Sequence, residues 1–384
     1  MSLSQDVLAH ARALGFDLVG IAPVGSPGHF DAFEAWLAAG HLGEMAYMGK
    51  SASLRADPRQ LAPGARTIVV VGANYHAGPR PELADPSRGR FARFAWAADY
   101  HDVLKSALYG LDAFIRERSG RTAHGKACVD TAPLLERAFA AQAGVGFIGR
   151  NTCLITPGLG SWTFLGALLV PESLDAKATT DAPRLPSPVL PGPVTAGCGR
   201  CTRCLDACPT GAFVAPYVLD ARRCVSYLTI ELREPIPRDL RSLLGNWVFG
   251  CDICQEVCPY NRAAPIAAWQ ALNPDWDRAA LPLLSLLSLK EEGFRSRFRG
   301  TSVFRAKRRG LVRNACVAAG NWGDPAAAPI LAQLLEDPEP AVRGHAAWAL
   351  GRTGGTEANR ALAHAFAVET DPWVSGEIAA ARLR

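Results

Sequence analysis

The sequence has no hydrophobic segment long enough to cross a membrane. The best candidate, Phe164–Val170, has the length of a strand, whereas a transmembrane helix needs roughly 18 or more apolar residues. The charged residues Asp6 and Arg12 interrupt the N-terminal segment, so it does not resemble a secretory signal peptide. We therefore expect a soluble cytoplasmic protein that makes no contact with a membrane.

Nucleotide-binding motifs are also missing. No G-x-G-x-x-G follows a predicted strand and no Walker A motif occurs, so nothing indicates a nucleotide cofactor. The net charge of +5 is too small to identify a nucleic-acid-binding protein, and only local clusters of charge can do so. With 384 residues, 49% of them hydrophobic, the chain is long enough for two or three folded domains.

Cysteine is abundant, and its spacing is specific. Eight of the 11 cysteines lie between Cys198 and Cys258. Disulfides are rare in the cytoplasm, so ligation of metal or of iron–sulfur clusters is favoured. The first group has the two-residue gaps and the Cys-Pro ending of bacterial two-cluster ferredoxins, and these gaps are too tight for one tetrahedral zinc ion. This group consists of Cys198, Cys201, Cys204 and Cys208-Pro209, and the second of Cys224, Cys251, Cys254 and Cys258-Pro259.

In such ferredoxins the last cysteine of each group binds the other cluster. The exchange assigns one 4Fe–4S cluster to Cys198, Cys201, Cys204 and Cys258. It assigns the other to Cys208, Cys224, Cys251 and Cys254. The 26 residues between Cys224 and Cys251 are an insertion that a simple electron carrier lacks. Iron–sulfur clusters transfer single electrons, so another part of the chain must hold the reaction centre.

The chain is predicted to be a multi-domain α+β protein. Residues 1–180 have an α/β pattern that includes an apolar strand over Thr67–Asn74, covered on both faces, and a hairpin formed by 153–156 and 162–170. A Pro-rich linker at 181–197 precedes a ferredoxin-like domain at 198–265. Residues 266–384 are helical, and similar segments begin at Val312, Val342 and Val374, at spacings of 30 and 32 residues. This resembles HEAT repeats; an ordinary Ala-rich helical bundle is the alternative.

Two residues of the N-terminal domain are candidates for the reaction centre. Asp130 ends a predicted strand, where α/β folds place ligands, and could donate a proton. It could equally cap a helix predicted over 132–144. His101 lies in an Asp-Tyr-His segment that is similar to a cobalamin-binding motif. Leu104 replaces the Gly of that motif, so we favour a histidine at the start of a helix over a cobalt ligand.

A basic segment precedes the helical repeats. Eight cations and no acidic residue lie between Gly293 and Asn314, with Phe294, Phe298 and Phe304 among them. A solvated helical face is the alternative, but the position at the start of a repeat array favours RNA phosphate contacts and base stacking. The predicted contacts are Arg305, Lys307, Arg308, Arg309 and Arg313.

Several segments together resemble the epoxyqueuosine reductase family. They are VDTAPLLERAFAAQAGVGFIGRNTCLITPGLGSWTFLGALL, SYLTIE after Cys224, GCDICQEVCP, and RAKRRGLVRNA before the repeats. The family is related to reductive dehalogenases and reduces epoxyqueuosine to queuosine at the tRNA wobble position. The resemblance, over residues 1 to about 350, implies cobalamin, two 4Fe–4S clusters, HEAT-like repeats and a nitroreductase-like N-terminal fold. It also implies a monomer, an unidentified electron donor, and an anticodon loop as the tRNA partner.

The resemblance implies roles for particular residues. Asp130 matches the family's proton donor, which protonates the epoxide oxygen. Cobalamin would lack a protein His ligand. The residues implied near it are Arg55, Arg93, Asp130, Leu154, Leu165, Ser226 and Asp252.

Two other functions are weighed against this one. A dehalogenase-like, cobalamin-dependent reductase of a small molecule would need neither the basic segment nor the repeats. A non-enzymatic ferredoxin-type electron carrier would bind no cobalamin.

Overall fold

The computed structural model describes residues 2–79, 81–176 and 197–383. They form two compact units, each assembled from three chain segments. The first comprises residues 1–78, 97–220 and 253–273, and the second 79–96, 221–252 and 274–384. Most of the predicted linker at 181–197 lies outside the described residues. No helix within the described ranges is long and apolar enough to span a membrane.

The first unit is built on a four-stranded antiparallel sheet. Its strand order is β1 (Leu18–Pro23), β2 (Thr67–Asn74), β7 (Thr163–Val170) and β4 (Lys126–Cys128). Its other elements are α1 (Leu3–Ala13), α2 (Phe30–Ala38), α3 (Ala46–Lys50), α4 (Ala52–Ala56), α5 (Tyr100–Ser119), α6 (Glu136–Gln142), β5 (Phe147–Ile148), β6 (Leu154–Ile155), α7 (Arg203–Asp206), β8 (Phe213–Ala215), β9 (Val218–Leu219) and α10 (Ile253–Glu256).

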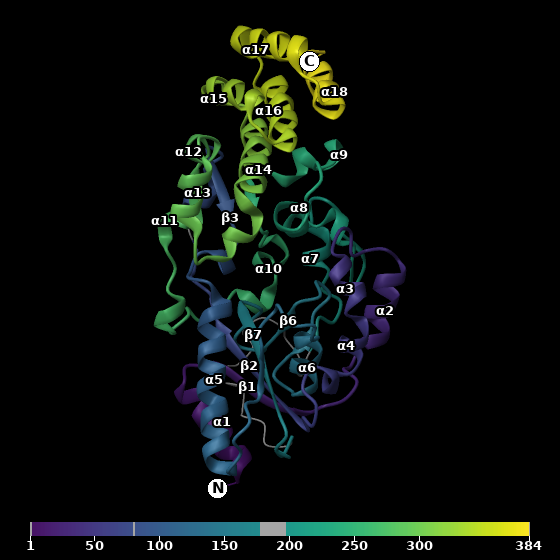
Figure 1. Ribbon diagram of the computed structural model, residues 1–384, viewed down its shortest axis with the longest axis vertical. Helices are drawn as coiled ribbons and strands as arrows, with labels where there is room; N and C mark the ends of the chain where they lie inside the picture. The colour runs from purple at the N-terminus through teal and green to yellow at the C-terminus, as the bar shows by residue number, and fades with distance from the viewer. Residues whose placement is uncertain (1, 80, 177–196, 384) are drawn as a thin grey trace. The chain divides into compact units, whose positions relative to one another are not determined.

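The alternation of side chains along β2 explains why helices cover both faces of this sheet. All eight residues of β2 are buried. Ile68 and Val70 lie in a core cluster with Phe139 of α6. On the other face, Val71 packs beside Leu108 of α5 at Gly166, where an added Cβ would lie 3.1 Å from Leu108. Figure 1 shows α1 and α5 side by side along the sheet. The predicted strand, covered on both faces, is confirmed.

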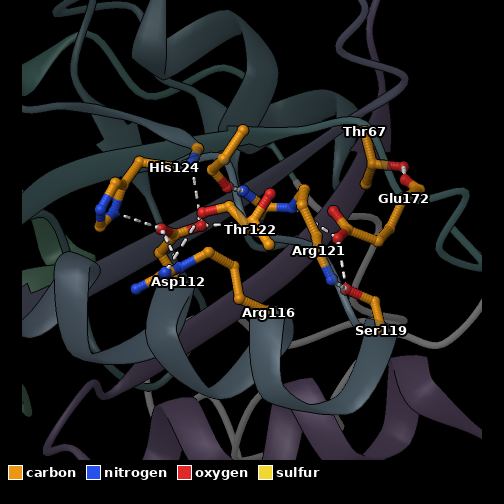
Figure 2. Close-up of polar contacts among 10 residues, drawn as sticks. Thr67, Asp112, Arg116, Ser119, Arg121, Thr122, His124 and Glu172 are labelled. Carbon is orange, nitrogen blue, oxygen red and sulfur yellow. Dashed lines mark hydrogen bonds and ion pairs between the residues drawn. The ribbon is translucent and has the colours of Figure 1, made fainter.

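A network of charged residues anchors the C-terminal end of α5 (Figure 2). Asp112 is fully buried, and its carboxylate lies 2.6 Å from Arg121 and 3.3 Å from His124. Arg121 also lies 2.7 Å from Glu172, just beyond β7. Because this end is tied to the segment after β7, the helix is fixed on the sheet that also carries β4.

The predicted hairpin is wrong. β6 pairs with β5, whereas β7 pairs with β2 and β4. Only a single bridge, between Thr156 and Gly160, closes the turn. The physical reason is that β7 is apolar on both faces and is buried in the centre of the sheet. The helix predicted over 132–144 also begins later, at Glu136.

The second unit contains a small sheet and the helical array. In the sheet, β3 (Arg88–Phe91) pairs in parallel with β10 (Trp247–Phe249) and antiparallel with β11 (Ala280–Pro282). The insertion between Cys224 and Cys251 supplies β10, so the predicted segment 198–265 is divided between the two units. The helices of this unit are α8 (Val225–Ile230), α9 (Arg238–Arg241), α11 (Trp276–Ala279), α12 (Leu283–Leu287), α13 (Glu291–Phe298), α14 (Lys307–Trp322), α15 (Ala328–Gln333), α16 (Pro340–Thr353), α17 (Gly355–Val368) and α18 (Pro372–Ala381).

The predicted repeat corresponds to alternate helices of this array, α14, α16 and α18 (Figure 1). Val312, Val342 and Val374 lie on α14, α16 and α18, and all three are completely buried. Asp371 caps α18 by accepting hydrogen bonds from two backbone N–H groups, as expected of an Asp-Pro helix start. Gly344 permits close packing, because an added Cβ would lie 2.2 Å from the Trp373 ring.

Candidate active site and cluster-binding cysteines

Asp130 lies in the loop between β4 and α6. It is a non-glycine residue with a left-handed backbone, at φ 51°. This conformation is sparsely populated and persists where the surrounding structure holds it. Its Oδ2 accepts a hydrogen bond of 3.0 Å from the Tyr100 hydroxyl and lies 3.4 Å from Nε2 of His101. Leu135 occupies the N-cap position of α6, so Asp130 does not cap this helix.

The first turn of α5 supplies the partners of Asp130. Asp99 is the N-cap and accepts a hydrogen bond from the backbone N–H of His101, which confirms that His101 starts a helix. The same carboxylate lies 2.6 Å from Nδ1 of His101. Burial lowers the pKa of His101, but hydrogen bonds and charges from Asp130 and Asp99 outweigh it and raise the pKa to about 9. The imidazole is therefore predominantly protonated at pH 7.

Tyr100 is fixed by stacking as well as by its hydrogen bond. Its ring lies parallel to that of Phe164 on β7, with the centroids 4.2 Å apart. Burial, followed by the charge of Asp130, raises the pKa of Tyr100 far above its ordinary value. The hydroxyl therefore keeps its proton and acts as a hydrogen-bond donor to Asp130.

Arg55 and Glu136 complete the charged surroundings of Asp130. Arg55 is buried and donates a hydrogen bond of 2.9 Å to the carbonyl of Leu134. Burial lowers the pKa of Arg55, and the charges of Glu136 and Asp130 partly offset this effect. Burial also raises the pKa of Glu136 to about 7. Arg55 and Asp130, both predicted from the sequence, therefore lie in one electrostatic environment.

Sequence reasoning missed Tyr100 and Glu136, and it set His101 aside. The available signal was the adjacency of Asp99, Tyr100 and His101 at a helix start, where all three are held close together. Nothing in the sequence indicated that this turn faces Asp130, because that contact depends on how β4 and α5 pack.

The other predicted cofactor contacts differ in their surroundings. Leu154 lies in the core of the first unit, with Leu165 packed against it. In the second unit, Asp252 accepts hydrogen bonds from the backbone and side chain of Arg93, at 2.8 and 3.1 Å, and both residues are buried. Ser226 is half-buried on α8.

The structure brings together the four cysteines assigned to one cluster. All four lie in the first unit. Burial is the largest cause that raises the pKa of Cys258 to about 11, and the nearby Cys198, Cys204 and Cys201 contribute to this rise. The left-handed backbone of Gly199, at φ 52°, turns the chain between the first two ligands. The backbone N–H of Arg150 donates to Sγ of Cys198 at 3.4 Å. Hydrogen bonds to the sulfurs are among the features that set the reduction potential of an iron–sulfur cluster.

The remaining assigned ligands are distributed over the two units. Cys208 and Cys254 belong to the first, and Cys224 and Cys251 to the second. The backbone N–H of Ala212 donates to Sγ of Cys208 at 3.3 Å. Among the described residues, no group of His, Cys, Asp and Glu side chains has the geometry of a site for a single metal ion.

Much of the basic segment serves the fold of the second unit. Arg313 is 2% exposed and donates hydrogen bonds to the carbonyls of Leu228, Leu232 and Glu234. The prediction that Arg313 contacts RNA is therefore wrong. Lys307 is exposed. The other three predicted cations form ion pairs. These pairs are Arg305 with Glu231, Arg308 with Asp337 and Arg309 with Glu339.

The aromatic residues of this segment also differ from the prediction. Phe294 and Phe298 are buried, so they cannot stack on RNA bases, whereas Phe304 is 37% exposed. Phe304 lines a hollow with Glu292, Ser296, Arg295 and Arg299. Both of these arginines are exposed, and they belong to the eight cations of the predicted basic segment, although they were not among the five specific contacts predicted.

Comparisons with known proteins agree with these features. Residues 197–261 match the family model of the 4Fe–4S double cluster binding domain, and residues 306–382 match HEAT repeats. Residues 55–131, which include Asp130, match the DUF1730 model of epoxyqueuosine reductase. The predicted iron–sulfur domain and HEAT-like repeats are thus confirmed.

Individual relatives extend the similarity over nearly the whole chain. The epoxyqueuosine reductase of Pseudomonas aeruginosa is 40% identical over 360 residues, which are 92% of this chain and 95% of the relative. A solved epoxyqueuosine reductase with an epoxyqueuosine-modified tRNA-Tyr stem loop is 31% identical, with a TM-score of 0.86 and coverage of 99% and 98%. The solved Bacillus subtilis enzyme, with its catalytic aspartate loop swung out of the active site, is 30% identical, with a TM-score of 0.84. The match covers 99% of this chain and 98% of that enzyme. This chain therefore belongs to the epoxyqueuosine reductase family of tRNA-modifying oxidoreductases.

Proposed function

We propose that this chain reduces epoxyqueuosine to queuosine at the wobble position of tRNA, with Asp130 as the proton donor. The observation that carries the proposal is the carboxyl group of Asp130, which two side chains of α5 hold at the end of β4. A carboxylic acid in this setting can protonate the oxygen of an opening epoxide. The solved Bacillus subtilis relative, with its catalytic aspartate on a loop, supports the same role for the loop residue Asp130.

Cobalamin is the cofactor that the family resemblance implies, and buried polar atoms of the first unit fit it. Nε of Arg55, Nδ2 of Asn151 and Oγ1 of Thr163 are buried without a hydrogen-bond partner among the described residues. Buried polar atoms ordinarily have partners, and the amide groups around a corrin ring can supply them. Cobalamin, when bound, supplies a low-potential cobalt centre for reduction of the epoxide.

We infer that Arg55, Leu154 and Leu165 hold this cofactor within a nitroreductase-like fold. Leu154 and Leu165 supply apolar surface, and Arg55 supplies a fixed cation and hydrogen-bond donor. Ser226 is a further cofactor contact that the family resemblance implies. Arg93 and Asp252, which bond to each other, are also proposed as cofactor contacts on the ground of that resemblance.

The remaining elements of the proposal follow from the cysteines. Two 4Fe–4S clusters, with the ligand sets assigned above, deliver electrons from a separate donor protein. We propose that the chain works as a cytoplasmic monomer. A dehalogenase-like function is less well supported, because this family acts on tRNA.

For the tRNA we propose a contact surface on α13 and the segment before α14. It consists of Arg295, Arg299, Phe304 and Lys307, which are exposed. Cations attract the phosphates, and the Phe304 ring offers a stacking surface for an unpaired base of the anticodon loop. The solved relative with a modified stem loop supports tRNA as the substrate.

The test is an anaerobic assay with cobalamin-loaded, iron-reconstituted protein, a chemical reductant and epoxyqueuosine-containing tRNA. Nucleoside mass spectrometry should show conversion to queuosine. Retention of epoxyqueuosine, with cobalamin and both clusters bound, would refute the proposal.

A further inference from the structure

The side chain of His101 lies between two carboxylates. Its Nδ1 is 2.6 Å from Oδ1 of Asp99, and its Nε2 is 3.4 Å from Oδ2 of Asp130. Asp99 is itself fixed, since its carboxylate caps α5. A carboxylate, an imidazole and a second carboxyl group therefore lie in one row within the first unit.

The position of Asp99 determines how the imidazole handles protons. A carboxylate beside Nδ1 keeps a proton on that nitrogen. Nε2 is then the atom that can exchange a proton with Asp130. Serine hydrolases use the same logic, in which a buried aspartate orients the histidine that exchanges protons with its neighbour.

The backbone of Asp130 gives the row a second role. Its left-handed conformation, at φ 51°, is unfavourable for an aspartate in isolation. The contacts that hold the carboxyl group come from Tyr100 and His101, which are adjacent on α5. The first turn of this helix therefore stabilises the loop from Val129 to Leu135.

We propose that the Asp99–His101 pair positions the carboxyl group of Asp130 and returns a proton to it after each turnover. This inference rests on the proposed function. In this step the Nε2–H bond of the imidazolium breaks and an Oδ2–H bond forms. The electron pair of the broken bond stays on Nε2, and the neutral imidazole keeps its proton on Nδ1. Water then supplies a proton to Nε2. His101 is thus a positioning residue that acts through Asp130.

The charges around the row keep a proton on the imidazole between turnovers. The groups that face His101 are Asp99 and Tyr100 on its own helix and Asp130 from the loop after β4. Arg55 on α4 and Glu136 on α6 also act on Asp130. The two carboxylates beside the imidazole raise the pKa of His101 to about 9, so the reserve proton is present at neutral pH.

The first test measures the proton without using activity. Full-length protein with 15N-labelled histidine is titrated by NMR. One of the eight histidines should titrate near pH 9. This signal should be lost in His101→Gln and move down by more than one pH unit in Asp99→Asn, which retains a helix-capping side chain. A His101 signal at the ordinary histidine pKa would overturn the proposal.

The matched control is His124→Gln. His124 also lies near an aspartate, 3.3 Å from Asp112, but beyond the other end of α5 (Figure 2). The signal near pH 9 should remain in this variant. Hydrogen exchange in residues 129–135 should accelerate in His101→Gln and stay unchanged in His124→Gln. Unchanged exchange in His101→Gln would refute the positioning role.

The second test is the pH dependence of steady-state reduction of epoxyqueuosine-containing tRNA, because the proposed return of the proton takes place between turnovers. We expect His101→Gln to react about 100-fold more slowly at neutral pH, as loss of proton-transfer assistance typically causes. The alkaline limb of the pH–rate profile of this variant should move to lower pH, while its KM for tRNA stays unchanged. A wild-type profile, or a rise in KM alone, would overturn the relay. If wild-type protein converts no substrate at any pH, the proposed function fails, whereas the NMR and exchange results still decide the role of His101.

Discussion

Arg241 and Glu377 form a buried, doubly hydrogen-bonded ion pair between α9 and α18. Both N–O distances are 2.9 Å, and the side chains are 1% and 4% exposed. Burial raises the pKa of Glu377, but hydrogen bonds from Arg241 and Arg238 outweigh it and hold the pKa below the ordinary value. The pair therefore joins the insertion between the cysteines to the last helix of the repeat array.

Replacing Glu377 should destabilise the fold. Glu377→Ala leaves Arg241 buried without its partner, which typically costs about 3–5 kcal/mol of unfolding free energy. Glu357→Ala on the exposed face of α17 is the control and should change little. Because the folded-state pKa of Glu377 is depressed, its stabilisation is present above the ordinary pKa of 4.5 and disappears as the pH falls through the folded value. Thermal unfolding against pH should show the two variants converge in acid.

Asp130→Asn should separate binding from chemistry. The amide keeps the size of the carboxyl group but cannot donate an acidic proton. We expect cobalamin and iron content to remain unchanged, while single-turnover reduction falls about 100- to 10,000-fold. Cofactor absorbance and nucleoside mass spectrometry measure the two effects. Full activity in this variant would exclude Asp130 as the proton donor.

Removal of one cluster ligand should remove one cluster. Cys258→Ala should reduce the iron content from about eight to about four atoms per chain, because each 4Fe–4S cluster uses four cysteines. Cys316→Ala is the matched control, since Cys316 is a buried thiol on α14 outside both ligand sets. Iron analysis after anaerobic reconstitution gives the result. Equal iron loss in both variants would contradict the assignment.

The exposed cations should control tRNA binding without affecting stability. Replacing Arg295 and Arg299 by Ala should weaken binding and lower the salt slope by about 1–2, since each lost phosphate contact removes roughly 0.7–0.9. Arg360→Ala on α17 removes another exposed cation and should leave the slope unchanged. Arg313→Ala should instead lower the melting temperature, because its guanidinium bonds to buried carbonyls. A slope that is unaffected by the double variant would exclude this surface.

Close packing within the repeat can be tested with two glycines. Gly344→Ala places a methyl group 2.2 Å from Trp373 and should cost about 1–3 kcal/mol of stability. Gly376→Ala on α18 meets no atom within 4 Å and should stabilise the helix by up to about 1 kcal/mol. Chemical denaturation of both variants measures the difference. If Gly344→Ala stabilised the protein and Gly376→Ala destabilised it, the packing of α16 on α18 would differ from that described.

Local chemistry in the sequence determined the features that depend on spacing. The cysteine gaps predicted an iron–sulfur unit because short gaps limit which thiolates can reach one cluster. The apolar pattern of residues 67–74 predicted a strand covered on both faces because side chains alternate along a strand. The recurrence at Val312, Val342 and Val374 predicted stacked helices, since each position must be buried against its neighbour.

Tertiary structure decided which residues meet. The contact of His101 with Asp130 joins segments that are separate in the sequence, and only the packing of α5 beside β4 creates it. Arg313 has the same charge as its exposed neighbours. It stabilises the fold because its guanidinium donates hydrogen bonds to backbone carbonyls within residues 228–234. The pairing of β7 with β2 likewise depended on burial of both faces in a common sheet. A sequence pattern specifies which chemistry is available, whereas long-range packing determines which groups are close enough to perform it.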